Sequence, residues 1–162
     1  MDKSINIILV SLNDKFCKSV GIQLSDTLEM FSANCEELII YDLINPKEVL
    51  QKCGIEYLRK REKAVVKNCS EYENTVITVS YDLFKSYSDL FNRSLKVYIK
   101  LPQGKQDKVP NSLDYVVRDE LLTKNSDITV ELEQKSNKKC IDLLLKKLGD
   151  YYENCWKNIK LC

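Results

Sequence analysis

The chain has 162 residues, of which 44% are hydrophobic, and this is the size of one domain with one substantial core. Its 25 Lys and Arg residues nearly balance 24 Asp and Glu residues, so the net charge of +1 gives no general attraction to nucleic acid or to an anionic membrane. The chain contains no His, the usual general base of Ser and Cys nucleophiles. Catalysis by a Ser-His or Cys-His pair is therefore excluded.

The N-terminal sequence and the cysteines indicate a cytoplasmic protein. Met1 is followed by Asp2, Lys3 and Ser4 and then by a strand, not by a signal peptide, and no stretch approaches the ~18 apolar residues of a membrane span. The seven cysteines are odd in number and widely spread, without CxxC spacing. This pattern favours free thiols, and we expect no metal ion.

Hydrophobic periodicity predicts strands that alternate with helices. In the first half of the chain it predicts a buried strand over residues 5–10, a helix over about 16–33 and a second strand over 37–41. Asn45 and Pro46 then begin a helical stretch that runs to residue 68 and is divided at Cys53 and Gly54.

The second half continues the alternation. The predicted elements are a strand within 74–80, a helix over 86–92, a strand over 95–101, a polar loop over 102–112, a last strand over 127–132 and an amphipathic helix over 136–157. Such an alternation predicts a single α/β domain over residues 1–162, with three α/β/α layers and a five-stranded parallel sheet.

Ligands of such sheets bind at the carboxyl ends of the strands. We therefore expect the segments 11–19, 79–82 and 102–118 to converge with Asp42 on one crevice.

The segment 11–19 has the position of a Walker A loop, GxxxxGK[ST], whose glycines let backbone amides surround phosphate oxygens. Here Ser11 and Phe16 stand at the glycine positions and Cys17 stands at the Lys position. A side chain at position 16 would obstruct the loop around a phosphate. We therefore expect a P-loop fold without a cofactor.

Three residues of this segment could still bind nucleotide if the loop is functional. Lys15 and Lys18 could reach a phosphate of ATP, and Ser19 could be a ligand of Mg²⁺. Cys17 could be a reactive thiol at a helix N-terminus, although a small buried side chain is the simpler interpretation.

The order of segments resembles that of shikimate kinases, small P-loop kinases that move the γ-phosphoryl of ATP to a hydroxyl of shikimate. The family pattern GExxFRxxE is similar to residues 54–62, which keep Gly54, Arg59 and Glu62, and RxPLYxxxAD is similar to residues 118–127, which keep Arg118 and Asp127. The family's two arginines bind the shikimate carboxylate, so the resemblance implies this role for Arg59 and Arg118.

The resemblance also implies a role for Asp42. The family has an acidic FxDxD stretch after the second strand, and Asp42, after Ile40 and Tyr41, keeps one of its two carboxylates. In the full motif this group orients the acceptor hydroxyl as a base. Structural alternatives stay open: Asp42 as a cap or turn residue, Arg59 on a solvated helix face, and Arg118 paired with Asp114 or Glu120.

Other parts of the family pattern are lost. The glycine motif after the central strand corresponds to Ser80-Tyr81-Asp82, and the lid, about residues 102–117, contains Lys105 and Lys108 but no Arg. The first hypothesis is a degenerate shikimate-kinase-like pseudoenzyme with a binding or regulatory role, for which a small carboxylate is the candidate ligand. The alternatives are a divergent but active small-molecule kinase, and an interaction module that binds a protein through its C-terminal helix and tail, residues 136–162.

Overall fold

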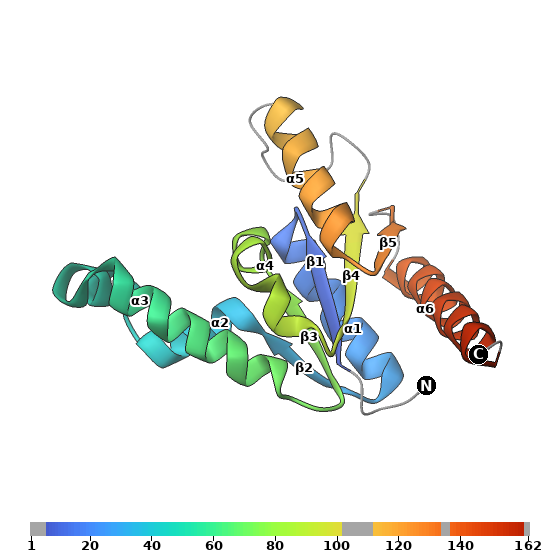
Figure 1. Ribbon diagram of the computed structural model, residues 1–162, viewed down its shortest axis with the longest axis horizontal. Helices are drawn as coiled ribbons and strands as arrows, with labels where there is room; N and C mark the ends of the chain where they lie inside the picture. The colour runs from blue at the N-terminus through green and yellow to red at the C-terminus, as the bar shows by residue number, and fades with distance from the viewer. Residues whose placement is uncertain (1–5, 102–111, 134–136, 161–162) are drawn as a thin grey trace.

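The computed structural model describes residues 6–101, 112–133 and 137–160 (Figure 1). Five strands form one sheet in the order β2-β3-β1-β4-β5, and every neighbouring pair is parallel. The strands are β1 (Ile7–Ser11), β2 (Phe31–Asn34), β3 (Thr75–Val79), β4 (Leu95–Lys100) and β5 (Ile128–Glu131). The predicted five-stranded parallel sheet is confirmed.

Helices cover both faces of the sheet. They are α1 (Asp14–Leu28), α2 (Cys35–Leu43), α3 (Pro46–Ser70), α4 (Tyr81–Tyr87), α5 (Ser112–Asn125) and α6 (Asn137–Lys160), with a 3₁₀ turn η1 at Ser88–Phe91. The strand residues of one face pack with α1 and α6, and those of the other face pack with α2, α3, α4 and α5. The predicted three-layer α/β/α architecture is therefore confirmed as well.

The predicted strand over residues 37–41 is wrong, because this segment lies in α2 and the second strand is β2, at residues 31–34. Asn34 caps α2 by accepting a hydrogen bond from the Glu37 amide at 3.0 Å. Cys35, Ile39 and Leu43 recur every four residues and bury one side of the helix. The apolar run 38–40 is thus one turn of an amphipathic helix.

Three other predicted boundaries also move. The helix expected over 16–33 is α1, at Asp14–Leu28, and the helix expected over 86–92 begins earlier, as α4 followed by η1. The lid expected over 102–117 contains the first turns of α5 from Ser112 onward, whereas residues 102–111, with Lys105 and Lys108, lie outside the described residues.

The helical stretch after Asn45 is divided as predicted. α3 is interrupted at Gly54, whose φ of 83° and ψ of 170° are not helical. A Cβ would be strained at this positive φ, which explains the glycine. In Figure 1, α2 and α3 extend away from the sheet on the side opposite α6.

The C-terminal helix uses its apolar side for the core. Cys140, Ile141, Leu144 and Leu148 of α6 are buried, and Tyr151 and Tyr152 pack against the same cluster. The apolar side of this helix over residues 140–152 therefore packs within the chain. Among the described helices, none has the length and apolar character needed to cross a lipid bilayer.

Candidate functional site

The turn between β1 and α1 is much shorter than a Walker A loop. β1 ends at Ser11 and α1 begins at Asp14, so only Leu12 and Asn13 connect them. The segment expected to turn over residues 11–19 is therefore helical from residue 14 onward. A loop that surrounds a phosphate has no residues left from which to form.

Three backbone amides at this helix start, those of Asn13, Phe16 and Cys17, are bonded within the chain. Asn13 Oδ1 accepts a hydrogen bond from the Phe16 amide at 3.0 Å, and the Asn13 carbonyl accepts one from the Cys17 amide at 2.9 Å. The Asn13 amide in turn donates to Ser11 Oγ at 3.3 Å. These are the donors that a P-loop would offer to phosphate oxygens, and here the Asn13 cap uses them.

Negative charge lies close to the same helix start. Burial, and then the charges of Asp14 and Glu36, raise the pKa of the Cys17 thiol well above its usual range. Cys17 is therefore a neutral buried side chain, in accord with the simpler interpretation of this residue. The same two carboxylates would repel a polyphosphate at this helix end.

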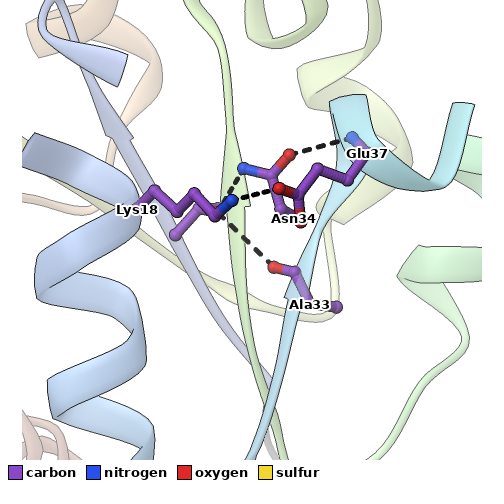
Figure 2. A network of polar contacts seen from close by, with 5 residues as sticks. Lys18, Ala33, Asn34 and Glu37 are labelled. Carbon is purple, nitrogen blue, oxygen red and sulfur yellow. Dashed lines mark hydrogen bonds and ion pairs between the residues drawn. The ribbon is translucent and has the colours of Figure 1, made fainter. Parts of the chain in front are cut away.

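Figure 2 shows what Lys18 contacts. Its Nζ forms an ion pair with Glu37 of α2, and the Glu37 amide donates to the Asn34 side chain. Asn34 Nδ2 donates to Thr78 Oγ1 at 2.8 Å, so the network joins α1 and α2 to β3. Lys18 thus has a carboxylate partner already.

Lys15 and Ser19 lie on the exposed side of α1. Ser19 is in the second turn of α1, well after the helix start at Asp14. The structure therefore places Lys15 and Ser19 on the exposed side of α1 and pairs Lys18 with Glu37.

The connection from β3 to α4 is closed in a similar way. Ser80 directly follows β3 and caps α4: its Oγ accepts a hydrogen bond from the Leu83 amide at 3.4 Å, and its carbonyl accepts one from the Phe84 amide at 3.0 Å. This is the position that corresponds to the family's glycine motif. Its backbone begins a short helix, whose first amides are used by this cap.

A cleft of 610 Å³ lies between α2, α3 and α4. Its walls are mainly apolar, and its charged side chains are Arg59, Glu36, Glu62 and Asp82. Ser80, Ser86 and Tyr87 add hydroxyl groups. A cleft of this size with an apolar wall and a few charged groups suits a small organic ligand.

The charges of the cleft are mostly negative. One guanidinium faces three carboxylates, and the Tyr87 hydroxyl lies near both Arg59 and Glu62, since both charges shift its pKa. Burial is the main cause that raises the pKa of Tyr87, followed by the charge of Glu62. A ligand that carries only negative charge would meet net repulsion here.

Arg118 is engaged elsewhere. Its Nε lies 3.3 Å from Asp114 Oδ2, one turn earlier on α5, and its guanidinium lies over the Tyr81 ring, 4.8 Å from the centroid. It is not among the described residues that line the cleft. The structure therefore brings Arg59 to the cleft without Arg118, and the ion pair with Asp114 is the alternative that the sequence left open.

Asp42 lies at the end of α2, away from the start of that helix. The Arg61 guanidinium binds it with two hydrogen bonds, from Nη2 to Oδ1 at 2.7 Å and from Nε to Oδ2 at 3.2 Å. This contact, through the hydrogen bond first and the charge second, raises the pKa of Arg61. The described residues that line the cleft do not include Asp42.

Glu36 is the site residue that sequence reasoning missed. Because β2 ends at Asn34, the residues directly after the second strand are Asn34, Cys35 and Glu36. Glu36 lines the cleft, whereas the Asn34 side chain is used by the cap of α2 and by Thr78. The acidic pair Glu36-Glu37 after a capping Asn was the available signal, and the wrong strand over 37–41 concealed it.

The sheet order β2-β3-β1-β4-β5, with a helix that directly follows β1 and a cleft over the second and third helices, defines a fold of the P-loop small-molecule kinase type. The chain is similar to three solved structures of such kinases. These similarities, all below 25% sequence identity, establish the fold.

The first is shikimate kinase from Aquifex aeolicus, with 23% identity, a TM-score of 0.73 and coverage of 91% of this chain and 98% of that one. The second is shikimate kinase from Acinetobacter baumannii in complex with shikimate, with 17% identity, a TM-score of 0.67 and coverage of 92% and 96%. The third is a gluconokinase from Sinorhizobium meliloti, with 16% identity, a TM-score of 0.61 and coverage of 98% and 99%.

No model of a known protein family matches the chain, and no curated protein sequence is significantly similar to it. The resemblance to shikimate kinases that the sequence suggested is confirmed as a similarity of structure.

Proposed function

We propose that this chain is a catalytically inactive protein of the small-molecule kinase fold that acts by binding a ligand. The observation that carries this proposal is the β1–α1 connection, in which only two residues separate β1 from α1 and the Asn13 cap takes the Phe16 and Cys17 amides. Phosphoryl transfer depends on positioning and neutralising a polyphosphate. Nothing at this helix start is arranged for either task.

The residues present do not fit ATP and Mg²⁺. A β-phosphate at the end of β1 would compete with Asn13 Oδ1 for the Phe16 amide and would face Asp14 and Glu36. Lys18 would have to leave Glu37 before it could pair with phosphate. These contacts favour a pseudoenzyme over a divergent kinase that uses Lys15, Lys18 and Ser19.

The cleft supports a binding role and defines a class of ligand. Arg59 can pair with a carboxylate, whereas Glu36, Glu62 and Asp82 can pair with an ammonium group, and the apolar wall can cover a hydrocarbon body. The ligand that suits all three features is a small amphipathic zwitterion. Its carboxylate corresponds to the small acid that the sequence suggested.

Calorimetric titrations with ATP·Mg²⁺ and with shikimate, together with an assay for ADP release, test the loss of kinase activity. We expect no saturable heat with ATP·Mg²⁺ and no ADP release above background, because no phosphate site is formed. Tight ATP binding with turnover would refute the pseudoenzyme and support the divergent kinase.

Three probes that share one apolar body test the ligand class: leucine, 4-methylpentanoate and 3-methylbutylamine. We expect leucine to bind best and the carboxylate to bind worst, with about tenfold or more lost for a missing charged contact. Arg59→Gln should reduce the preference for leucine over the amine. Arg118→Gln is the matched control and should leave this preference unchanged. If 4-methylpentanoate binds most tightly of the three probes, the assigned ligand class is wrong.

A further inference from the structure

The end of the arm formed by α2 and α3 is an exposed apolar surface. We call it the α2–α3 tip, and it consists of six large side chains that are each nearly half exposed or more: Ile40, Tyr41, Ile44, Leu50, Ile55 and Tyr57. Tyr41 and Ile44 are exposed at 84% and 85%, so neither contributes appreciably to the core. Many large exposed apolar side chains on one arm mark a contact with another molecule.

The backbone at the tip is strained at Ile44, although the side chain of this residue is exposed to solvent. Ile44 has φ of 63° and ψ of −57°, and the Asn45 amide donates to the Leu43 carbonyl at 2.6 Å, which makes a three-residue γ-turn. This turn is rare and strained, and a β-branched side chain fits positive φ poorly. Since glycine would adopt this backbone freely and the Ile44 side chain is not buried, folding of the monomer does not explain an isoleucine here.

The charges around the tip are compatible with a second copy of the chain. Asp42 is paired with Arg61, and Glu48 is paired with Lys52, so these four charges are neutralised within the arm. The net charge of +1 gives no long-range repulsion between copies. A self-complementary surface of this kind is what a two-fold symmetric dimer requires.

The exposed area of the tip also suits a protein–protein interface. A standard interface buries about 800 Å² on each partner, and six large side chains exposed to this degree supply area on that scale. We propose that the α2–α3 tip is a homodimer interface in which Tyr41 and Ile44 of each copy are covered by the tip of the other. Ile40 and Ile55 of the tip also line the cleft, so the proposed interface adjoins the ligand site.

Sedimentation velocity of the whole chain over a range from about 1 to 200 μM tests the proposal, because interfaces of this size have dissociation constants of micromolar or below. We expect a concentration-dependent dimer. Tyr41→Gln and Ile44→Gly should each weaken it at least tenfold. Ile22→Gln, which changes an exposed isoleucine of α1 outside the tip, is the matched control and should leave it unchanged.

Thermal unfolding at low protein concentration supplies a second readout that a merely damaged fold would not give. Ile44→Gly should raise the midpoint of the monomer by about 2–4 °C, because it relieves the strained turn while it removes the contact. A wild-type chain that stays monomeric up to the highest concentration would overturn the proposal. So would a dimer that Tyr41→Gln and Ile44→Gly leave intact, or an Ile44→Gly variant with a lower midpoint.

Discussion

Gly21→Ala should lower the free energy of unfolding by about 2–3 kcal/mol. Gly21 lies in α1 against β3, and a Cβ on it would come 2.4 Å from Thr78 Cγ2. Thr78 cannot easily turn away, because it is β-branched and its hydroxyl accepts a hydrogen bond from Asn34 Nδ2. The helix would have to move off the sheet, and the network in Figure 2 would be strained with it.

Urea denaturation checks this value, and the chain offers two controls. Gly149→Ala is the matched change on α6, where a Cβ meets no atom within 4 Å, and it should stabilise the protein slightly because Ala is the better helix former. Thr78→Ser removes the opposing methyl group and keeps the hydroxyl, so it should restore much of the stability of Gly21→Ala. If Gly21→Ala is as stable as the wild type, the close packing of α1 on β3 is wrong.

Asp119→Ala should lower the free energy of unfolding by about 2–3 kcal/mol. Asp119 of α5 accepts a hydrogen bond from the Tyr98 hydroxyl at 2.8 Å and one from Lys100 Nζ at 3.2 Å. Tyr98 is fully buried, and burial followed by this hydrogen bond raises the pKa of its hydroxyl. Without Asp119 the Tyr98 hydroxyl loses this acceptor inside the core, and α5 loses its polar contact with β4.

Two variants serve as comparisons for Asp119→Ala: one changes another aspartate of the same helix, and the other changes Asp119 to a different residue. Asp114→Ala breaks the solvent-exposed ion pair with Arg118 and should change stability by less than about 1 kcal/mol. Asp119→Asn keeps a carbonyl acceptor and should be less destabilising than Asp119→Ala. Equal losses for Asp114→Ala and Asp119→Ala in urea denaturation would contradict the assigned role of the buried hydrogen bond.

The sheet was predictable because most of its strands have the local sequence pattern that is typical of buried strands. β1 and β3 are buried on both faces and consist of continuous β-branched and aliphatic residues, as in Val76-Ile77-Thr78-Val79. β2 does not have this character: it is an edge strand of four residues that contains Ser32 and Asn34, and Phe31 is exposed. The apolar run of α2 was therefore taken for the second strand, although Asn34 and two glutamates marked a helix start.

α5 was missed for a different physical reason. Val116 and Val117 are exposed and Leu122 is fully buried, so the helix has only a weak apolar stripe. It is held to the sheet partly by the polar contact of Asp119 with Tyr98, which no periodicity reveals. The lid that the family resemblance implied, about residues 102–117, therefore includes residues that are helical from Ser112 onward.

The candidate site was predictable only for those of its residues that lie close together on one helix. Arg59 and Glu62 lie one turn apart on α3 and line the cleft together, whereas Asp42 and Arg118 each have an ion-pair partner within the chain. The partner of Arg118 is one turn away and was among the alternatives, but the partner of Asp42 is Arg61, on a different helix. The sequence pattern around Asp42 contains no information about that partner.

The sequence pattern also could not predict how short the β1–α1 connection is. Substitutions at positions 16 and 17 indicated a damaged phosphate loop, but the pattern still placed a loop over residues 11–19. The structure replaces that loop with helix, because Asn13 provides a cap and Phe16, Cys17 and Val20 pack into the core. The proposed loss of the phosphate site is therefore a change of backbone as well as of side chains.

The central proposal is that the Phe16 and Cys17 amides, which are bonded to Asn13, do not bind a polyphosphate. It is tested most directly by following the backbone amide resonances of Asn13 to Ser19 in ¹H–¹⁵N spectra while ATP·Mg²⁺ is added in large excess. We predict that the Phe16 and Cys17 resonances keep their positions throughout the titration. Saturable shifts of these two resonances would contradict the account, because they would mean that the cap opens and that a phosphate takes its place.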